Sequence, residues 1–116
     1  MKNYIDLEER TFQFSKKIVF LIRKLPQDIP NTNSAKQLVR SGTSIGANYI
    51  EANDPLGKKD SLMHLKISRK EAKESVYWLK LILETNYSPD PDCKSLLNEA
   101  IELKLILSKM IDNFRN

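Results

Sequence analysis

Residues 38–54, LVRSGTSIGANYIEAND, decide the fold because they have the spacing of a helix and yet contain two glycines. Apolar residues recur there at steps of three and four, which is the period of a helix. Gly42 and Gly46 fall on the same apolar side. Glycine inside a helix costs about 1 kcal/mol relative to alanine, so such a pair indicates close approach by another backbone. We therefore expect a second helix to pack tightly over both glycines.

The same periodicity continues on both sides of this stretch and predicts four helices, over residues 6–25, 34–53, 58–85 and 91–114. Pro26 and Pro30 are expected to end the first helix, and Ser34 to cap the second. Asp90 or Asp92 is expected to cap the fourth. No segment has the alternation of a strand. Short links leave consecutive helices adjacent, so we expect one all-α domain over residues 1–116, an antiparallel up-down-up-down four-helix bundle.

Apolar stripes on the four helices supply the predicted core. The second helix is expected to bury Ala35, Leu38, Val39, Gly42, Ile45, Gly46, Tyr49 and Ala52. The third is expected to bury Leu62, Leu65, Ala72, Val76, Leu79 and Leu83. Six large apolar residues lie off the stripes: Phe12, Phe20, Ile67, Trp78, Leu81 and Leu105. Either a subunit interface buries them, or the helix phases differ slightly and they flank an ordinary core.

Composition excludes several classes of protein. The chain has 116 residues, of which 41% are apolar and 29% charged, and a net charge of +4, which permits an anionic partner without requiring one. No apolar run approaches the roughly 18 residues of a membrane span, and the first residues lack the order of a signal peptide. We expect a cytoplasmic protein that is not associated with a membrane. The single cysteine cannot form an internal disulfide.

Residue patterns typical of catalysis are missing from the sequence. His64 and Cys93 are the only histidine and cysteine, and a helix of about 1.5 Å rise per residue separates them by roughly 30 Å. His64 is expected at the surface, and Cys93 is expected to be a small residue in a first helical turn. Ser61 stands where a Glu-x-x-His metal pair needs a glutamate, and no phosphate-binding loop follows the glycines. We therefore predict no catalytic residue, metal site or cofactor, and a protein that is not an enzyme.

A line of polar residues runs beside the glycines on the second helix and consists of Arg40, Ser44, Asn48 and Glu51. A similar line on the third helix consists of Glu71, Glu74, Ser75 and Trp78. If the two lines face each other, Arg40 would pair with Glu74 or with Glu51, and Asn48 would bridge backbone groups. Such a satisfied network would fix the register of two helices. The alternative is a polar cleft that takes a small ligand.

A basic line on the third helix consists of Lys59, Lys66, Lys70, Lys73 and Lys80, with Met63 and Tyr77 between the lysines. Their spacing of three, four and seven residues puts them on one face, spread over roughly 30 Å. Such a line is able to follow a phosphate backbone. The alternative is an ordinary solvated helix face, with Glu74 and Glu84 neutralising part of the charge.

Two segments carry a family resemblance, RSGTSIGANYIEA at residues 40–52 and SRKEAKESVYWL at residues 68–79. They resemble the bacterial four-helix bundle proteins associated with intervening sequences of 23S ribosomal RNA genes. The shared pattern Arg-Ser-x-x-Ser-Ile-x-x-Asn-x-x-Glu is matched by Arg40, Ser41, Ser44, Ile45, Asn48 and Glu51. The chain departs from that family at Ala52 and Asn53, where a glycine is common.

The resemblance implies an up-down bundle that assembles with copies of itself into a ring, commonly a homopentamer, and has no recognised catalytic residue. It also implies similarity to the accessory proteins of diversity-generating retroelements, which bind nucleic acid and a reverse transcriptase. Our leading hypothesis is therefore a cytoplasmic homo-oligomer that binds RNA or DNA through basic helix surfaces. The alternative is a scaffold that binds a protein partner and no nucleic acid, with lysines that serve only solubility.

Overall fold

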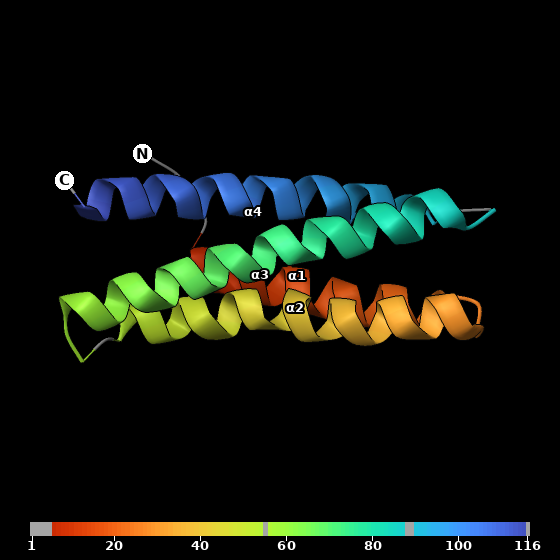
Figure 1. The fold of residues 1–116 in the computed structure, drawn as a ribbon, viewed down its shortest axis with the longest axis horizontal. Helices are drawn as coiled ribbons and strands as arrows, with labels where there is room; N and C mark the ends of the chain where they lie inside the picture. Colours follow the sequence, from red (N-terminus) through yellow and green to blue (C-terminus); the bar gives the residue numbers. More distant parts are fainter. Residues whose placement is uncertain (1–5, 55, 88–89, 116) are drawn as a thin grey trace.

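Four helices make up the fold, in a computed structural model that describes residues 6–54, 56–87 and 90–115. Their bounds are Leu7–Lys24 (α1), Ile29–Asn53 (α2), Lys58–Thr85 (α3) and Pro91–Arg115 (α4). Each helix runs antiparallel to the next, and α1 and α4 close the bundle (Figure 1). The predicted all-α four-helix bundle is confirmed. No helix in the described ranges is long and apolar enough to cross a membrane. The expected cytoplasmic location stays a prediction.

Side chains cap the helices where the sequence changes from loop to helix. Asp6 Oδ1 accepts a hydrogen bond of 3.1 Å from the amide of Glu8 at the start of α1. Asp90 Oδ1 accepts one of 2.8 Å from the amide of Asp92, so Asp90 is the capping residue of α4. Both caps satisfy amides that have no partner within their own helix.

The start of α2 differs from the prediction, because the helix begins at Ile29 rather than at Ser34. Asp28 is the cap, and its Oδ1 accepts a hydrogen bond of 2.9 Å from the amide of Asn31. Pro30 lies in the first turn, where a proline is tolerated because no helical carbonyl needs its missing N–H. Ser34 is therefore buried inside the helix instead of capping it. Pro30, which we expected to help end the first helix, in fact lies in the first turn of the second.

Glycines form the contact between α2 and α1. A Cβ atom added at Gly46 would lie 2.8 Å from Thr11 Oγ1 and 3.1 Å from Thr11 Cβ. One added at Gly42 would lie 3.2 Å from Ile18 Cγ1. The helix that approaches both glycines is therefore α1, and the approach is closer at Gly46 than at Gly42.

Serines form the contact between α2 and α3, and they were missing from the predicted stripes. Ser61 Oγ donates a hydrogen bond of 2.9 Å to the carbonyl of Ala52, and Ser68 Oγ donates one of 2.7 Å to the carbonyl of Ile45. The hydroxyls of Ser41 and Ser75 lie 2.9 Å apart. We call these four buried residues the serine seam. Its three members on α3 repeat every seven residues, so they keep one side of that helix against α2.

This orientation corrects several predicted core positions. Because the serines face α2, Leu62, Val76 and Leu83 are only partly buried and pack at the border of the core. Val39 is exposed on α2, although we expected it to be buried. The core itself includes Phe14, Ile18, Leu21, Leu38, Ile45, Leu65, Leu79, Leu103, Leu107 and Ile111.

The apolar residues off the predicted stripes fall into two groups. Ile67 and Trp78 are half-buried, and Trp78 packs against the core. Phe12, Phe20, Leu81 and Leu105 are exposed. A small error in helix phase accounts for the first group, whereas the second group stays without cover in a single chain.

Candidate functional site

The basic line of α3 lies on the outer side of the bundle. Four of its lysines are exposed and Lys66 is half-buried. Met63 and Tyr77, which lie between the lysines, are exposed as well. We call these seven residues the lysine face: Lys59, Met63, Lys66, Lys70, Lys73, Tyr77 and Lys80. Among the described residues, none of its five ammonium groups has a carboxylate within ion-pair distance.

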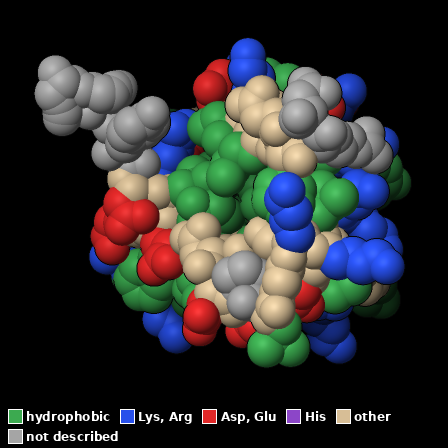
Figure 2. All heavy atoms as spheres, turned by 90° about the vertical axis from the view of Figure 1, so that its left-hand side faces the viewer, with side chains coloured by type: hydrophobic (Ala, Val, Ile, Leu, Met, Phe, Trp, Pro, Cys, Tyr) green, Lys and Arg blue, Asp and Glu red, His purple; other side chains and the backbone are tan. Residues whose placement is uncertain are grey.

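Charge is distributed unevenly over one end of the bundle. Figure 2 shows the end of the bundle where α2 meets α3, and Lys and Arg side chains crowd the right-hand edge of that view. Most acidic side chains visible in the view lie to the left and below. An anion approaching this end of the molecule therefore meets a basic side and an acidic side.

A shallow groove of about 480 Å³ runs along the first half of the lysine face. Its lining consists of Lys59, Leu62, Met63, Lys66, Ile67 and Lys70. The cations thus border a floor of aliphatic carbon. A ligand that fills this groove would offer both a negative charge and an apolar surface.

Tyr77, in the second half of the lysine face, forms an aromatic pair with the adjacent half-buried Trp78. The rings of Tyr77 and Trp78 meet edge to face, with centroids 4.9 Å apart and planes at 86°. This geometry is favourable for aromatic rings. Trp78 Nε1 donates a hydrogen bond of 3.2 Å to Glu74 Oε2. The tryptophan is therefore held from two sides while Tyr77 is open to solvent.

Arg40 of α2 forms ion pairs with two glutamates of α3 that lie beside the aromatic pair. Its guanidinium pairs with Glu74 and, at 3.2 Å between Nη1 and Oε1, with Glu71. The hydrogen bond from Arg40 holds the pKa of Glu74 below its ordinary value, with smaller contributions from the Trp78 hydrogen bond and the charge of Lys70. Glu74 is therefore a carboxylate at neutral pH. Of the two pairings considered from the sequence, the structure has the one with Glu74.

Of the other residues predicted for this network, Ser44 and Asn48 form hydrogen bonds, whereas Glu51 does not. Ser44 Oγ donates to the carbonyl of Arg40 at 2.6 Å, and Asn48 Nδ2 donates to the carbonyl of Ser44 at 3.0 Å. Asn48 Oδ1 lies 3.2 Å from Nδ1 of His64. Glu51 is exposed and takes no part in these contacts. His64, which we expected at the surface, is half-buried between the two helices, because Asn48 reaches its ring.

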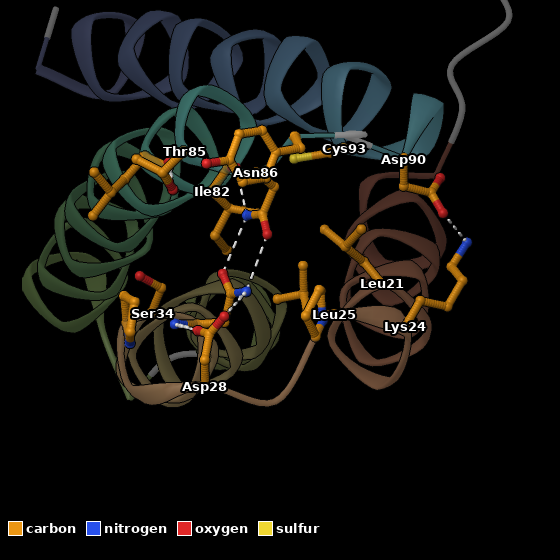
Figure 3. Close-up of a pocket in the computed structure, with 15 residues that line it drawn as sticks. Leu21, Lys24, Leu25, Asp28, Ser34, Ile82, Thr85, Asn86, Asp90 and Cys93 are labelled. Carbon is orange, nitrogen blue, oxygen red and sulfur yellow. Dashed lines mark hydrogen bonds and ion pairs between the residues drawn. The ribbon is translucent and has the colours of Figure 1, made fainter.

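A second cavity, of about 580 Å³, lies at the opposite end of the bundle (Figure 3). All four helices contribute to it, and Leu21, Leu25 and Ile82 form apolar walls. Asn31 and Asn86 exchange two side-chain hydrogen bonds of 3.0 and 3.1 Å across it. The sequence reading missed this pair because it placed Asn31 in a loop. The capping sequence around Asp28 and Pro30 was the signal that would have placed Asn31 in a helix.

Cys93 lines the same cavity and is buried. Desolvation, with a smaller contribution from the charge of Asp90, raises the pKa of this thiol to about 11. The cysteine is therefore a protonated thiol at neutral pH, which is a poor nucleophile. Asp90 itself is paired with Lys24, at 2.8 Å between Nζ and Oδ2.

His64 lies near the start of α3, whereas Cys93 of α4 contacts Leu79 near the end of α3. No group of three or more His, Cys, Asp or Glu side chains suited to a metal ion occurs within residues 6–54, 56–87 and 90–115. The expectation that the protein is not an enzyme stays a prediction.

Comparisons with known proteins agree with the family resemblance of the sequence. Residues 4–109 match the family described as 23S rRNA-intervening sequence protein. A crystal structure from Bacteroides thetaiotaomicron VPI-5482, described as a protein with unknown function from the S23 ribosomal protein family, is 34% identical. The match covers 90% of this chain and 94% of that one, with a TM-score of 0.80. No curated protein matches the chain.

Proposed function

The chain belongs to the 23S rRNA-intervening sequence protein family, and we propose that it is a non-catalytic accessory protein that binds nucleic acid through the lysine face of α3. The observation that carries the proposal is the set of five lysines on one helix side, none paired with a carboxylate among the described residues. Lysines without a partner in their own chain are free to pair with phosphates.

The proposed mechanism is neutralisation of phosphates rather than reading of bases. Each ammonium group that contacts a phosphate releases counterions, so the affinity falls steeply with salt. Five contacts to duplex DNA would lower the affinity by about 500-fold between about 50 and about 200 mM salt. Lys66, Lys70 and Lys73 stand at the centre of the face and are expected to contribute most.

The first test is fluorescence anisotropy of a labelled RNA stem-loop and a labelled DNA duplex, titrated with the protein at both salt concentrations. We expect binding that weakens steeply with salt, and the difference between the two ligands identifies the preferred nucleic acid. Absence of binding at the lower salt concentration would contradict the proposal.

Charge reversal at the centre of the face tests which surface binds. The variant Lys66→Glu, Lys70→Glu, Lys73→Glu is expected to lose binding and to retain its helical circular dichroism. The matched control is Lys16→Glu, Lys36→Glu, Lys109→Glu, which removes the same charge from exposed positions on the other helices. Equal losses in the two variants would mean that net charge, and not the lysine face, determines binding.

We also propose that the protein associates with copies of itself, as the resemblance to a pentameric family implies. The exposed residues Phe12 and Phe20 of α1 and Leu105 of α4 support this proposal, because solvated side chains of this size favour burial in an interface. Light scattering of the protein and of Phe12→Ser, Phe20→Ser tests it. We expect an oligomer, pentameric in the first instance, that the double substitution dissociates. A wild-type monomer would contradict the proposal.

The same exposed apolar residues favour the second candidate function, a scaffold that binds another protein. The two functions differ in one experiment. If the protein fails to bind nucleic acid and a pulldown after nuclease treatment is dominated by one protein, the scaffold replaces the nucleic-acid proposal.

A further inference from the structure

We infer that the lysine face binds unpaired, single-stranded nucleic acid in preference to a duplex, with Tyr77 as the surface on which a base stacks. This inference rests on the proposed function and specifies its ligand. Stacking of bases on aromatic side chains combined with phosphate contacts to basic ones is the general mode of single-strand binding. The lysine face has both kinds of group on one helix side.

The position of Tyr77 fits a stacking surface. The residue is 60% exposed, and its neighbours along the same face are Lys73 and Lys80, one turn before and one turn after. A base placed on the ring would therefore have cations on both sides, where the flanking phosphates of a strand lie. A duplex keeps its bases stacked inside and has no base face to offer to the ring.

A chain of contacts holds the ring in place before any ligand arrives. Trp78 meets Tyr77 edge to face, Glu74 accepts the hydrogen bond of Trp78, and Arg40 pairs with Glu74. Each contact restricts the next side chain, so less conformational entropy is lost when a base binds. The network between α2 and α3 therefore has a part in positioning the aromatic surface.

The groove at the start of α3 supplies a second apolar contact on the same face. Its floor includes Leu62, Met63 and Ile67, and lysines border it. Phosphates and sugars of a duplex would meet the lysines and leave this aliphatic floor unfilled. An unpaired base would cover it. Met63 and Tyr77 are separated by about 21 Å along the helix, so one strand is able to reach both contacts.

The experiment compares ligands by anisotropy at about 50 mM salt. The probes are a labelled oligouridylate of about 20 nucleotides, an RNA duplex of about the same length, and an abasic strand of the same phosphate count. We expect the oligouridylate to bind about tenfold more tightly than either other probe, since stacking contributes strongly per base. Fluorescence of Trp78, the only tryptophan, is expected to change with the oligouridylate and not with the duplex.

Substitution of Tyr77 assigns the effect to its ring. Tyr77→Ala is expected to lower the affinity for oligouridylate about tenfold and to change duplex binding less than about twofold, whereas Tyr77→Phe keeps the wild-type preference. Tyr87→Ala is the matched control, because Tyr87 is a second exposed tyrosine but lies beyond the end of α3 and outside the lysine face. It is expected to bind like the wild type.

The outcomes separate this inference from the proposed function. If the duplex or the abasic strand binds as tightly as oligouridylate, or if Tyr77→Ala and Tyr87→Ala behave alike, the single-strand inference is wrong while phosphate binding stands. If none of the three probes binds, the proposed function fails as well.

Discussion

The two sides of α2 achieve close packing in different ways. Toward α1 it presents Gly42 and Gly46, and Thr11 and Ile18 fill the space that a side chain would take. Toward α3 it meets the serine seam, whose hydroxyls are hydrogen bonded across the boundary. Both sides are close because the residues are small. The hydrogen bond beside the glycines, from Ser15 Oγ to the carbonyl of Gly42, is long at 3.4 Å, whereas the three bonds of the serine side measure 2.7 to 2.9 Å. Glycine therefore supplies mainly space, whereas serine supplies space and register.

The most damaging change to this arrangement is a large side chain on the glycine side. Gly46→Leu is expected to lower the free energy of unfolding by about 3 kcal/mol, because Thr11 Oγ1 lies only 2.8 Å from the position of the added Cβ and leaves no space for a larger side chain. Chemical denaturation monitored by circular dichroism measures the loss. A neutral result would mean that α1 does not lie close to Gly46.

A smaller change compares the two glycines with each other. Alanine improves helix propensity by about 1 kcal/mol at either position, but the added Cβ meets different neighbours. Gly46→Ala is expected to destabilise, since the Cβ would lie 2.8 Å from the buried Thr11 Oγ1. Gly42→Ala is expected to be close to neutral, since Ile18 at 3.2 Å needs to move only slightly. The melting temperatures of the two variants measure this difference. If Gly42→Ala melted at the lower temperature, α1 would not approach Gly46 more closely than Gly42.

Between α2 and α3, replacement of a serine by alanine keeps the residue small but removes its hydrogen bond to the other helix. Ser68→Ala is expected to lower the free energy of unfolding by about 1 kcal/mol, because Ser68 is fully buried and donates to the carbonyl of Ile45. Ser95→Ala, at an exposed position of α4, is the control and is expected to change stability by less than about 0.5 kcal/mol. If Ser68→Ala is as stable as the wild type, the seam acts through residue size alone.

The smallest change in stability is expected from the Arg40–Glu74 ion pair, which lies at the solvent-exposed border between α2 and α3. Because Arg40 holds the pKa of Glu74 below its ordinary value of 4.5, the pair stabilises the fold above that pH, and its contribution is lost as the pH falls through the lower value. Pairs this accessible contribute about 0.2 to 1 kcal/mol. Glu74→Gln is therefore expected to melt slightly earlier than the wild type at pH 7 and at the same temperature in acid. A difference that persists in acid would assign the effect to packing.

The two sides of α2 also differ in how well the sequence predicts them. The glycines were recognised because glycine is unfavourable in a helix and therefore needs an explanation. The sequence places Ser75 in the polar line that faces the second helix, but it does not predict that Ser61 and Ser68 are buried, because serine is ordinarily counted among polar, exposed residues. Their repeat of seven was visible in the sequence, but only the partners on α2 show that they face inward.

The candidate site was predicted in part for a similar reason. Spacing along one helix is a local property, so the lysine face was found from the sequence. Contacts between helices depend on how the helices are rotated, so the sequence left Arg40 with two possible partners and gave no indication that Trp78 positions Tyr77. The position of His64 against Asn48 depended on the same rotation.

The reactivity of the buried Cys93 thiol reports local opening of the bundle. The thiol is buried at the start of α4, with Sγ 3.6 Å from the carbonyl of Leu79 on α3, and its raised pKa keeps it protonated. A thiol reagent therefore reacts only when this end of the bundle opens. At low reagent concentration the labelling rate, divided by that of the unfolded chain, gives the equilibrium constant for opening. Without any substitution, one residue thus measures how often α3 and α4 separate.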